Sequence, residues 1–460
     1  MSAKVIIKQY AIAIQRKLKA LLKRYPFHNI LLLILLAPGG YLFPLAFPFL
    51  FMASVAQLFH KLTHLPPFDL VSILAWWPLV MWCAVAILLM SICVRLMQVR
   101  PAKPEGFVLT RKQVPQLFDM IRDFSAIRGQ MAIHRVVITD RFELDIVKTR
   151  LCILPLWSYN TLVIGLPLAQ MIPPNVFRAL VARKLSQHTW LRNPILHWLH
   201  QLSGAWRQYC QCFKTKASPD SLMLLAFYKG YSALYNFLAE PVARLDGLSA
   251  DRHTLKVVND EDMVESVEYL FVAGMFIEKI FWPRLHEYAY EKNRYDLKPF
   301  QTLLKTGYTY LSKVDINGWL AREMKGGNSP RWGVSPMSVR LDHLGHDEVY
   351  ELSIINDSAA SLYFGDRLAE IIRAIDSTWA ARTIPDWRKQ DDYTRRLRAL
   401  MNTLRDKSRS LNYGFTDLFS YTKTAIHLRR YSVLPKILKM FFKTRITLAR
   451  KNRTATMSTS

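Results

Sequence analysis

One stretch of the 460-residue chain decides the fold, Asn160-Thr-Leu-Val-Ile-Gly-Leu-Pro-Leu-Ala-Gln-Met-Ile-Pro-Pro-Asn-Val-Phe-Arg-Ala-Leu-Val-Ala-Arg-Lys-Leu-Ser-Gln-His188. Its first part, Thr161 to Leu166, is β-branched or apolar and ends at a Gly/Pro turn, which predicts a short β-strand. Asn175 follows two prolines and is the expected N-cap of a helix. Apolar residues then recur at helical spacing and mark one buried face, at Phe177, Leu180, Val181 and Leu185.

This order of strand, turn, proline-rich cap and apolar helix resembles the core of the membrane zinc metallopeptidases of the HtpX and CAAX prenyl protease type. The helix of that family centres on Ala-His-Glu-Leu-Gly-His, and this chain has Ala182-Arg-Lys-Leu-Ser-Gln187 at the matching place. The resemblance covers roughly residues 68–390. It implies an α+β, mainly helical fold: a gluzincin-like domain with a small β-sheet, preceded by two N-terminal transmembrane helices.

The matching residues have a different chemistry from those of a zinc site. In an HExxH helix the two histidines share one face and bind zinc, and the glutamate acts as general base. Here Arg183 and Gln187 replace the histidines, and Lys184 replaces the glutamate. Arginine cannot be deprotonated in a protein. The repulsion between its charge and a divalent ion about 4 Å away would cost on the order of 8 kcal/mol at an effective dielectric of about 20. We therefore expect no bound metal, no cofactor and no catalytic residue.

The stretch Glu240-Pro-Val-Ala-Arg-Leu-Asp-Gly-Leu-Ser-Ala-Asp251 matches a second family motif, Glu-x-x-Ala-Asp. In the family this glutamate is the third zinc ligand, and the aspartate orients a ligand histidine. The third-ligand position is Gly247 here, whereas Asp251 persists. The charge swap predicts that Arg183 occupies the vacated metal position and pairs with Asp251 or Asp246. The degenerate positions are Arg183, Lys184, Gln187, Gly247 and Asp251.

Other polar residues near these motifs have simpler interpretations. Glu143 and Leu144 stand where the family carries an Asn-Ala pair at the edge of its cleft. His188 lies off the ligand face of the helix, which favours a capping or surface role. His197 and His200 are three residues apart but have no acidic or cysteine partner nearby in sequence, so a core or interfacial role is favoured over zinc binding.

The apolar segments near the N-terminus predict a membrane anchor. Residues 30–51 and 70–93 are uncharged and long enough to span a bilayer, and prolines interrupt the first. The loop between them has Lys61 as its one lysine or arginine, while basic residues flank both outer ends. This distribution predicts an integral protein of the bacterial inner membrane with the N-terminus and the large C-terminal part in the cytoplasm. A re-entrant hairpin is the alternative for the first segment.

The chain is 51% hydrophobic and carries a net charge of +27, which implies an anionic partner. The pattern of both ends predicts basic amphipathic helices that lie on anionic phospholipid. Their aromatic residues fall on the apolar face and not between the charges, so lipid is favoured over nucleic acid. The five cysteines have no regular spacing, which argues against a zinc ribbon and favours reduced thiols.

These patterns divide the chain into five parts. They are a basic N-terminal segment (1–28), a transmembrane hairpin (29–97), a metallopeptidase-like domain (98–270), a helical extension (271–425) with a flexible loop at 325–331, and a basic tail (426–460). We predict a non-catalytic pseudoenzyme that binds an unknown protein or peptide in its cleft at the cytoplasmic membrane face. The alternatives are a divergent zinc metalloendopeptidase and an adaptor that binds anionic lipid or nucleic acid, since fold does not fix function.

Overall fold

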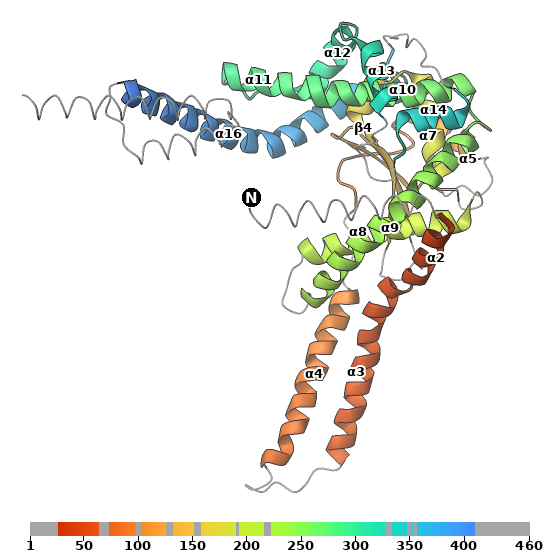
Figure 1. The fold of residues 1–460 in the computed structure, drawn as a ribbon, viewed down its shortest axis with the longest axis vertical. Coiled ribbons are helices and arrows are strands. Elements are labelled where there is room, and N and C mark those ends of the chain that lie inside the picture. The colour runs from red at the N-terminus through yellow and green to blue at the C-terminus, as the bar shows by residue number, and fades with distance from the viewer. Residues whose placement is uncertain are drawn as a thin grey trace, which may run out of the picture. The chain divides into compact units, whose positions relative to one another are not determined.

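The computed structural model (Figure 1) describes residues 26–63, 73–97, 103–125, 132–150, 158–189, 193–215, 222–326, 334–346, 352 and 357–409. Most of the basic N-terminal segment, the whole basic tail and most of the loop predicted at 325–331 lie outside these residues. The chain forms two compact units. The first comprises Met1–Trp282 and Pro299–Ile375, and the second comprises Pro283–Lys298 and Asp376–Ser460.

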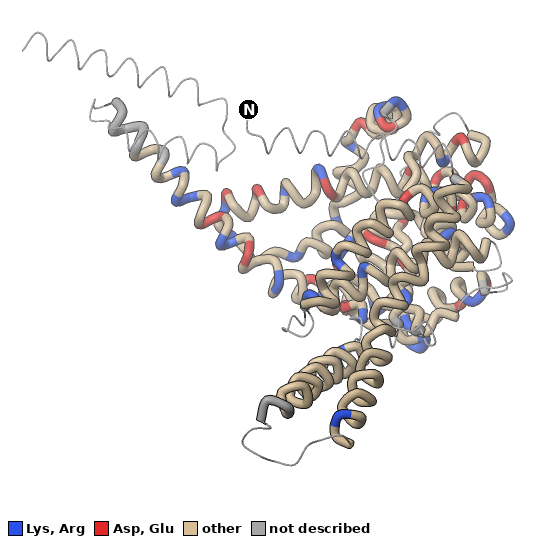
Figure 2. Tube along the Cα trace, turned by 60° about the horizontal axis from the view of Figure 1, so that its bottom comes forward, with Lys and Arg blue, Asp and Glu red and all other residues tan. Residues whose placement is uncertain are grey.

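Three apolar helices open the described part of the first unit. They are α2 (Pro26–Leu36), α3 (Gly39–Thr63) and α4 (Ile73–Met97). Two stretches, Phe27–Thr63 and Trp76–Met97, are long and apolar enough to cross a membrane. The helix breaks at Pro38 as predicted, but α3 contains two further prolines and continues beyond the predicted end at residue 51. Figure 2 shows α3 and α4 side by side and almost bare of charge, with Lys61 and Arg95 as their charged residues.

A four-stranded mixed sheet supports the site. Its strands are β1 (Phe107–Leu109), β2 (Arg135–Thr139), β3 (Leu144–Arg150) and β4 (Ser158–Gly165), in the order β1-β2-β4-β3. Strands β2 and β4 run parallel, whereas β3 pairs antiparallel with β4 and forms an edge of the sheet. The α+β, mainly helical fold is therefore confirmed. The predicted strand at 161–166 is longer than expected at its start, and Leu166 already begins α6 (Leu166–Met171).

Helix α7 (Pro174–Gln187) follows the sheet and has the predicted buried face. The prediction of Asn175 as its N-cap is wrong. Proline lacks an N–H and suits the first position of a helix, so Pro174 starts α7 and Pro173 takes the cap position. Asn175 instead donates from Nδ2 to the carboxylates of Asp262 (2.8 Å) and Glu265 (3.1 Å) on α10 (Asp260–Phe276).

Helices α8 (Pro194–Thr215) and α9 (Leu222–Thr254) lie where the apolar hairpin joins the rest of the unit (Figure 1). The motif stretch at residues 240–251 lies in the C-terminal part of one long helix, α9, with Pro241 inside it. Together with α2, these helices enclose a set of rings that we call the aromatic cluster: Trp206, Tyr209, Phe213, Tyr228, Tyr231 and Tyr235.

The aromatic cluster provides hydrogen bonds to the backbone of α2 and α3. Tyr228 Oη donates to the carbonyl of Gly40 at 3.0 Å. In an unbroken helix that carbonyl would accept from the residue four positions on, but this residue is Pro44, which has no N–H. Tyr231 Oη donates to the carbonyl of Leu36 at the break before α3. Gly40 is required here, because an added Cβ would lie 2.6 Å from the ring of Trp206.

The remaining helices of the first unit are α5 (Pro115–Ser125), α12 (Pro299–Leu311), α13 (Ile316–Gly326), α14 (Met337–Leu344), α15 (Ala359–Phe364) and the start of α16 (Leu368–Arg409). Lys325 and Gly326 end α13, so the first two residues of the predicted loop are helical. The second unit contains most of α11 (Trp282–Lys292) and of α16, and there the buried Asp391 accepts from His286 and Tyr295. The four described cysteines form no disulfide.

Candidate functional site

A cavity of about 720 Å³ lies in the first unit, bounded by β3, α7, α8, α9 and α14. All the degenerate motif positions line it, although 60 or more residues of sequence separate those on α7 from those on α9. The predicted edge residues Glu143 and Leu144 also line the cavity. The motif residues concerned are Arg183, Lys184 and Gln187 on α7, and Gly247 and Asp251 on α9.

Helical periodicity explains this convergence. Arg183 and Gln187 are four residues apart on α7 and share a face, and Gly247 and Asp251 do the same on α9. Helices α7 and α9 pack against each other. A Cβ added at Gly247 would lie 3.7 Å from Nη2 of Arg183. The guanidinium group therefore lies over the glycine, in space that a side chain at position 247 would share.

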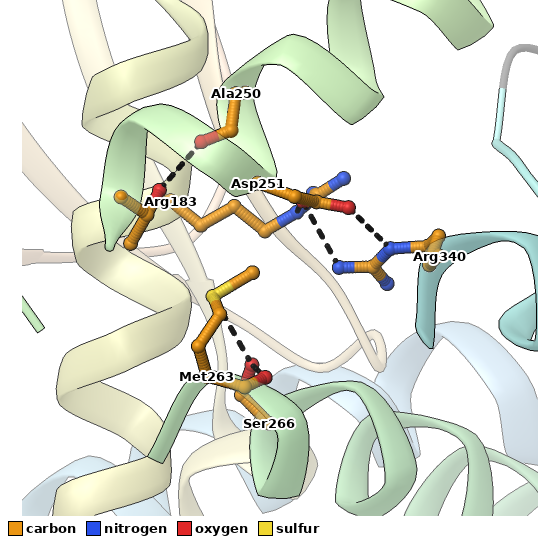
Figure 3. A network of polar contacts seen from close by, with 7 residues as sticks. Arg183, Ala250, Asp251, Met263, Ser266 and Arg340 are labelled. Atoms are coloured by element: carbon orange, nitrogen blue, oxygen red, sulfur yellow. Dashed lines mark hydrogen bonds and ion pairs between the residues drawn. The ribbon is translucent and has the colours of Figure 1, made fainter. Parts of the chain in front are cut away.

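Asp251 is fully buried and binds two arginines (Figure 3). Arg183 donates from Nε to Oδ1 of Asp251. Arg340, on α14, donates from Nε to Oδ2 at 2.8 Å and from Nη2 to Oδ1 at 3.2 Å. The predicted pairing of Arg183 with Asp251 is confirmed. The other predicted partner, Asp246, is also buried but accepts from Nδ1 of His200 at 2.8 Å.

The charges of these groups leave the Arg183–Asp251–Arg340 triad positive. Burial opposes ionisation of Asp251, but the two guanidinium groups outweigh it and lower the pKa of this carboxyl. Burial and the charge of Arg183 both lower the pKa of Arg340, against the attraction of Asp251. An arginine remains protonated in proteins, so two cations and one anion give the triad a formal charge of +1. Lys184 binds elsewhere, donating to Asp145 at 3.2 Å.

Three histidines, His188, His197 and His200, line the same cavity as the triad. His188 is the C-cap of α7, which confirms the capping role, and its ring faces the cavity and not the outer surface. Burial lowers the pKa of His188 to about 3, so its ring is neutral at physiological pH. Nδ1 of His188 has no hydrogen-bond partner among the described residues. His197 is buried and contacts Gln201, which agrees with the predicted core role.

Arg340 was missed by sequence reasoning. It lies far from both motifs, and its own neighbourhood, Met337-Ser-Val-Arg-Leu341, contains no recognisable pattern. The available signal was its place on α14 three residues after Met337 and next to Leu341, both of which are buried. A cation on a buried helix face needs an anionic partner, but the sequence does not indicate which one.

The residues of the site do not have the chemistry of a metal centre. In the ranges that the structure describes, no group of three His, Cys, Asp or Glu side chains is arranged to hold an ion. The motif positions instead present a guanidinium, an ammonium and an amide to the cavity. No family model, curated protein or solved structure matches the chain.

Proposed function

We propose that the protein is a membrane-anchored, non-catalytic binding module, whose cleft is derived from that of a zinc metallopeptidase of the HtpX type. The observation that carries this proposal is the triad of Arg183, Asp251 and Arg340. The guanidinium of Arg183 lies over Gly247, where the resemblance places a metal ligand. A cation held by its own buried counter-ion takes the place of zinc.

The chemistry of the cleft supports binding without hydrolysis. An ammonium group cannot accept a proton from water, so Lys184 cannot act as the general base that this position requires. Lys184 is also occupied by its ion pair with Asp145. The cavity is nevertheless retained, and its volume of about 720 Å³ falls within the usual range for ligand sites.

The apolar hairpin supports the membrane part of the proposal. Lys61 lies at the end of α3 next to the connection with α4, and Arg95 lies at the opposite end of the pair. Because basic residues accumulate beyond Arg95, we place the cleft and the N-terminus in the cytoplasm, at the bacterial inner membrane. The basic ends of the chain would then lie against anionic phospholipid.

Metal content tests this proposal. The full chain, purified in detergent and dialysed against trace zinc, is expected to hold far less than stoichiometric zinc by elemental analysis. Near-stoichiometric zinc in a folded protein would overturn the proposal of a non-catalytic module, because other ligands would then have replaced the lost ones.

A restored site tests the derivation from a metallopeptidase. The triple variant Arg183→His, Gln187→His, Gly247→Glu puts two imidazoles and a carboxylate around the same space, and it is expected to bind zinc. The matched control carries Gly247→Gln in place of Gly247→Glu and should bind zinc much more weakly. A folded triple variant without zinc would show that the three positions do not form the remains of a metal site.

A further inference from the structure

The walls of the cleft carry an excess of positive charge. Among the described residues that line it, six side chains are lysine or arginine and three are carboxylates. Counting the buried Asp246 behind the wall leaves the cations ahead, six to four. The cations come from several elements and converge on one space. They are Arg141, Lys148, Arg183, Lys184, Arg207 and Arg340.

Arg183 has hydrogen-bond donors to spare in this space. A guanidinium carries five N–H donors, and Arg183 gives the one on Nε to Asp251. Within the described residues, no other acceptor takes a hydrogen bond from Arg183. Its Nη2 faces Gly247, where no side chain fills the space. The side chain is only 12% exposed, so the remaining donors point into a partly desolvated cavity where an anionic acceptor would satisfy them.

Neutral donors and further cations surround this position. Lys148 on the edge strand β3 donates to Oε1 of Gln201 at 3.1 Å, and Gln208 donates to the carbonyl of Lys148 at 3.4 Å. These contacts hold the β3 wall and the α8 wall together around the cavity. The amides and cations of β3 and α8 bring hydrogen-bond donors and positive charge to the cavity in addition to those of Arg183.

We propose that this cleft binds a phosphate-bearing ligand, with the Nη groups of Arg183 as its main contact. This inference deepens the proposed function, since it names the chemistry that the non-catalytic cleft would take. A phosphate monoester carries close to two negative charges at neutral pH and suits the excess of cations better than a single carboxylate does. A guanidinium fork matches the geometry of phosphate oxygens, and the volume of about 720 Å³ leaves room for the group that the phosphate esterifies.

The phosphate could belong to a soluble metabolite or to a lipid headgroup. Both sources are considered because helix α8 links the cleft to the apolar hairpin: Arg207 lines the cleft, and Trp206 beside it belongs to the aromatic cluster. Two ligands that share the same monoester separate these cases. Glycerol 3-phosphate is the soluble form, and dihexanoyl phosphatidic acid adds two short acyl chains.

Calorimetric titration of the full chain in an uncharged maltoside detergent tests the inference, at constant ionic strength and with both ligands. Binding of both with similar affinity indicates a soluble phosphate ester, and an affinity about tenfold or more higher for the acylated ligand indicates a headgroup. If neither ligand binds more tightly than chloride, the inference is overturned. The zinc content does not depend on that result, so failure of the phosphate proposal can be distinguished from failure of the proposed non-catalytic function.

Substitution of Gly247 tests whether the phosphate binds beside Arg183. Gly247→Glu adds a carboxylate beside Nη2 of Arg183 and is expected to weaken phosphate binding about tenfold or more, while the fold is kept because the carboxylate neutralises the excess charge. Lys184→Met removes one wall cation and should weaken binding severalfold. Lys279→Met, at an exposed lysine of the π-helical turn Ile277–Phe281, is the matched control for net charge and should leave affinity unchanged. Wild-type affinity in Gly247→Glu would overturn the assignment to Arg183.

Discussion

The two halves of α9 hold buried polar groups in different ways. In its first half, neutral tyrosine hydroxyls donate to carbonyls of the apolar helices, one of which has lost its helical donor to Pro44. In its second half, Asp251 takes hydrogen bonds from two guanidinium groups at the wall of a polar cavity. Neutral donors suffice beside the apolar helices, whereas the triad at the cavity wall keeps a formal charge of +1.

Removal of Asp251 should lower the free energy of unfolding the most, because Asp251 is the anion that both arginines of the triad bind. Asp251→Asn leaves the cations of Arg183 and Arg340, which are 12% and 5% exposed, without their counter-ion. Breaking a buried ion pair in this way costs about 3–5 kcal/mol of unfolding free energy. Urea unfolding of the detergent-solubilised chain measures it. Adding Arg340→Leu to the variant should recover part of the loss, and a loss below about 1 kcal/mol would contradict a buried charged network.

Acid should lower the stability of the protein through two groups of the cleft, His188 first and Asp251 at lower pH. The folded-state pKa of His188 is about 3 and its ordinary value is 6.5. Between these values the unfolded chain binds a proton that the folded chain does not, so stability falls as the pH falls, by about 1.4 kcal/mol per pH unit. The pKa of Asp251 is lowered below 3.8, so its contribution is complete above that pH and is lost as the pH falls through the folded-state value.

Unfolding titrations between pH 4 and pH 7 check the contribution of His188. His188→Gln is expected to flatten the pH dependence of the free energy of unfolding, since the titrating ring is gone. His60→Gln, at an exposed histidine on α3, serves as the matched control and should keep the wild-type slope. The same slope in wild type and His188→Gln would exclude the buried imidazole as its source.

Loss of a tyrosine hydrogen bond in the first half of α9 should lower the free energy of unfolding by less, and this loss should not depend on pH. Tyr228→Phe leaves the buried carbonyl of Gly40 without a donor, which costs about 1–2 kcal/mol. Burial raises the pKa of Tyr228, so the hydroxyl keeps its proton and the loss should be equal at pH 5 and pH 8. Thermal unfolding of Tyr228→Phe beside Tyr288→Phe, which alters an exposed ring, measures the difference. A loss confined to one pH would refute the neutral character of this network.

The ion pair of Lys184 with Asp145, two residues that line the cavity, should contribute least to stability. Lys184 and Asp145 are 22% and 56% exposed, and exposed pairs contribute about 0–1 kcal/mol. Lys184→Met should therefore change stability by less than about 1 kcal/mol in urea unfolding, although it weakens phosphate binding. A large loss of stability would place Lys184 among the structural charges with Arg183 and Arg340.

The sequence was informative wherever a local pattern determined the outcome. Apolar length predicted the hairpin, and helical spacing predicted the buried face of α7. The motif positions predicted that Arg183 would meet Asp251. Asn175 shows the limit of local rules, because Pro174 starts the helix before it and its amide donates to carboxylates of α10 that are distant in sequence.

Contacts between distant segments were out of reach. Arg340 joins Asp251 across 89 residues and Tyr228 reaches Gly40 across 188. Neither pairing follows from the periodicity of its own helix. A buried arginine or an apolar-face tyrosine indicates that a partner exists, but only the packing of the helices determines its identity.

The hydroxyls of the aromatic cluster also constrain how the protein can be shortened. A chain beginning after Met97 would lose α2 and α3, and with them the carbonyls that accept hydrogen bonds from Tyr228 and Tyr231. It would uncover rings that are now fully buried, including those of Trp206 and Tyr235. Exposed apolar patches of this kind promote aggregation. The hairpin is therefore part of the folded domain, and a soluble version of the cleft would require a redesigned α8–α9 surface and not simply a deletion.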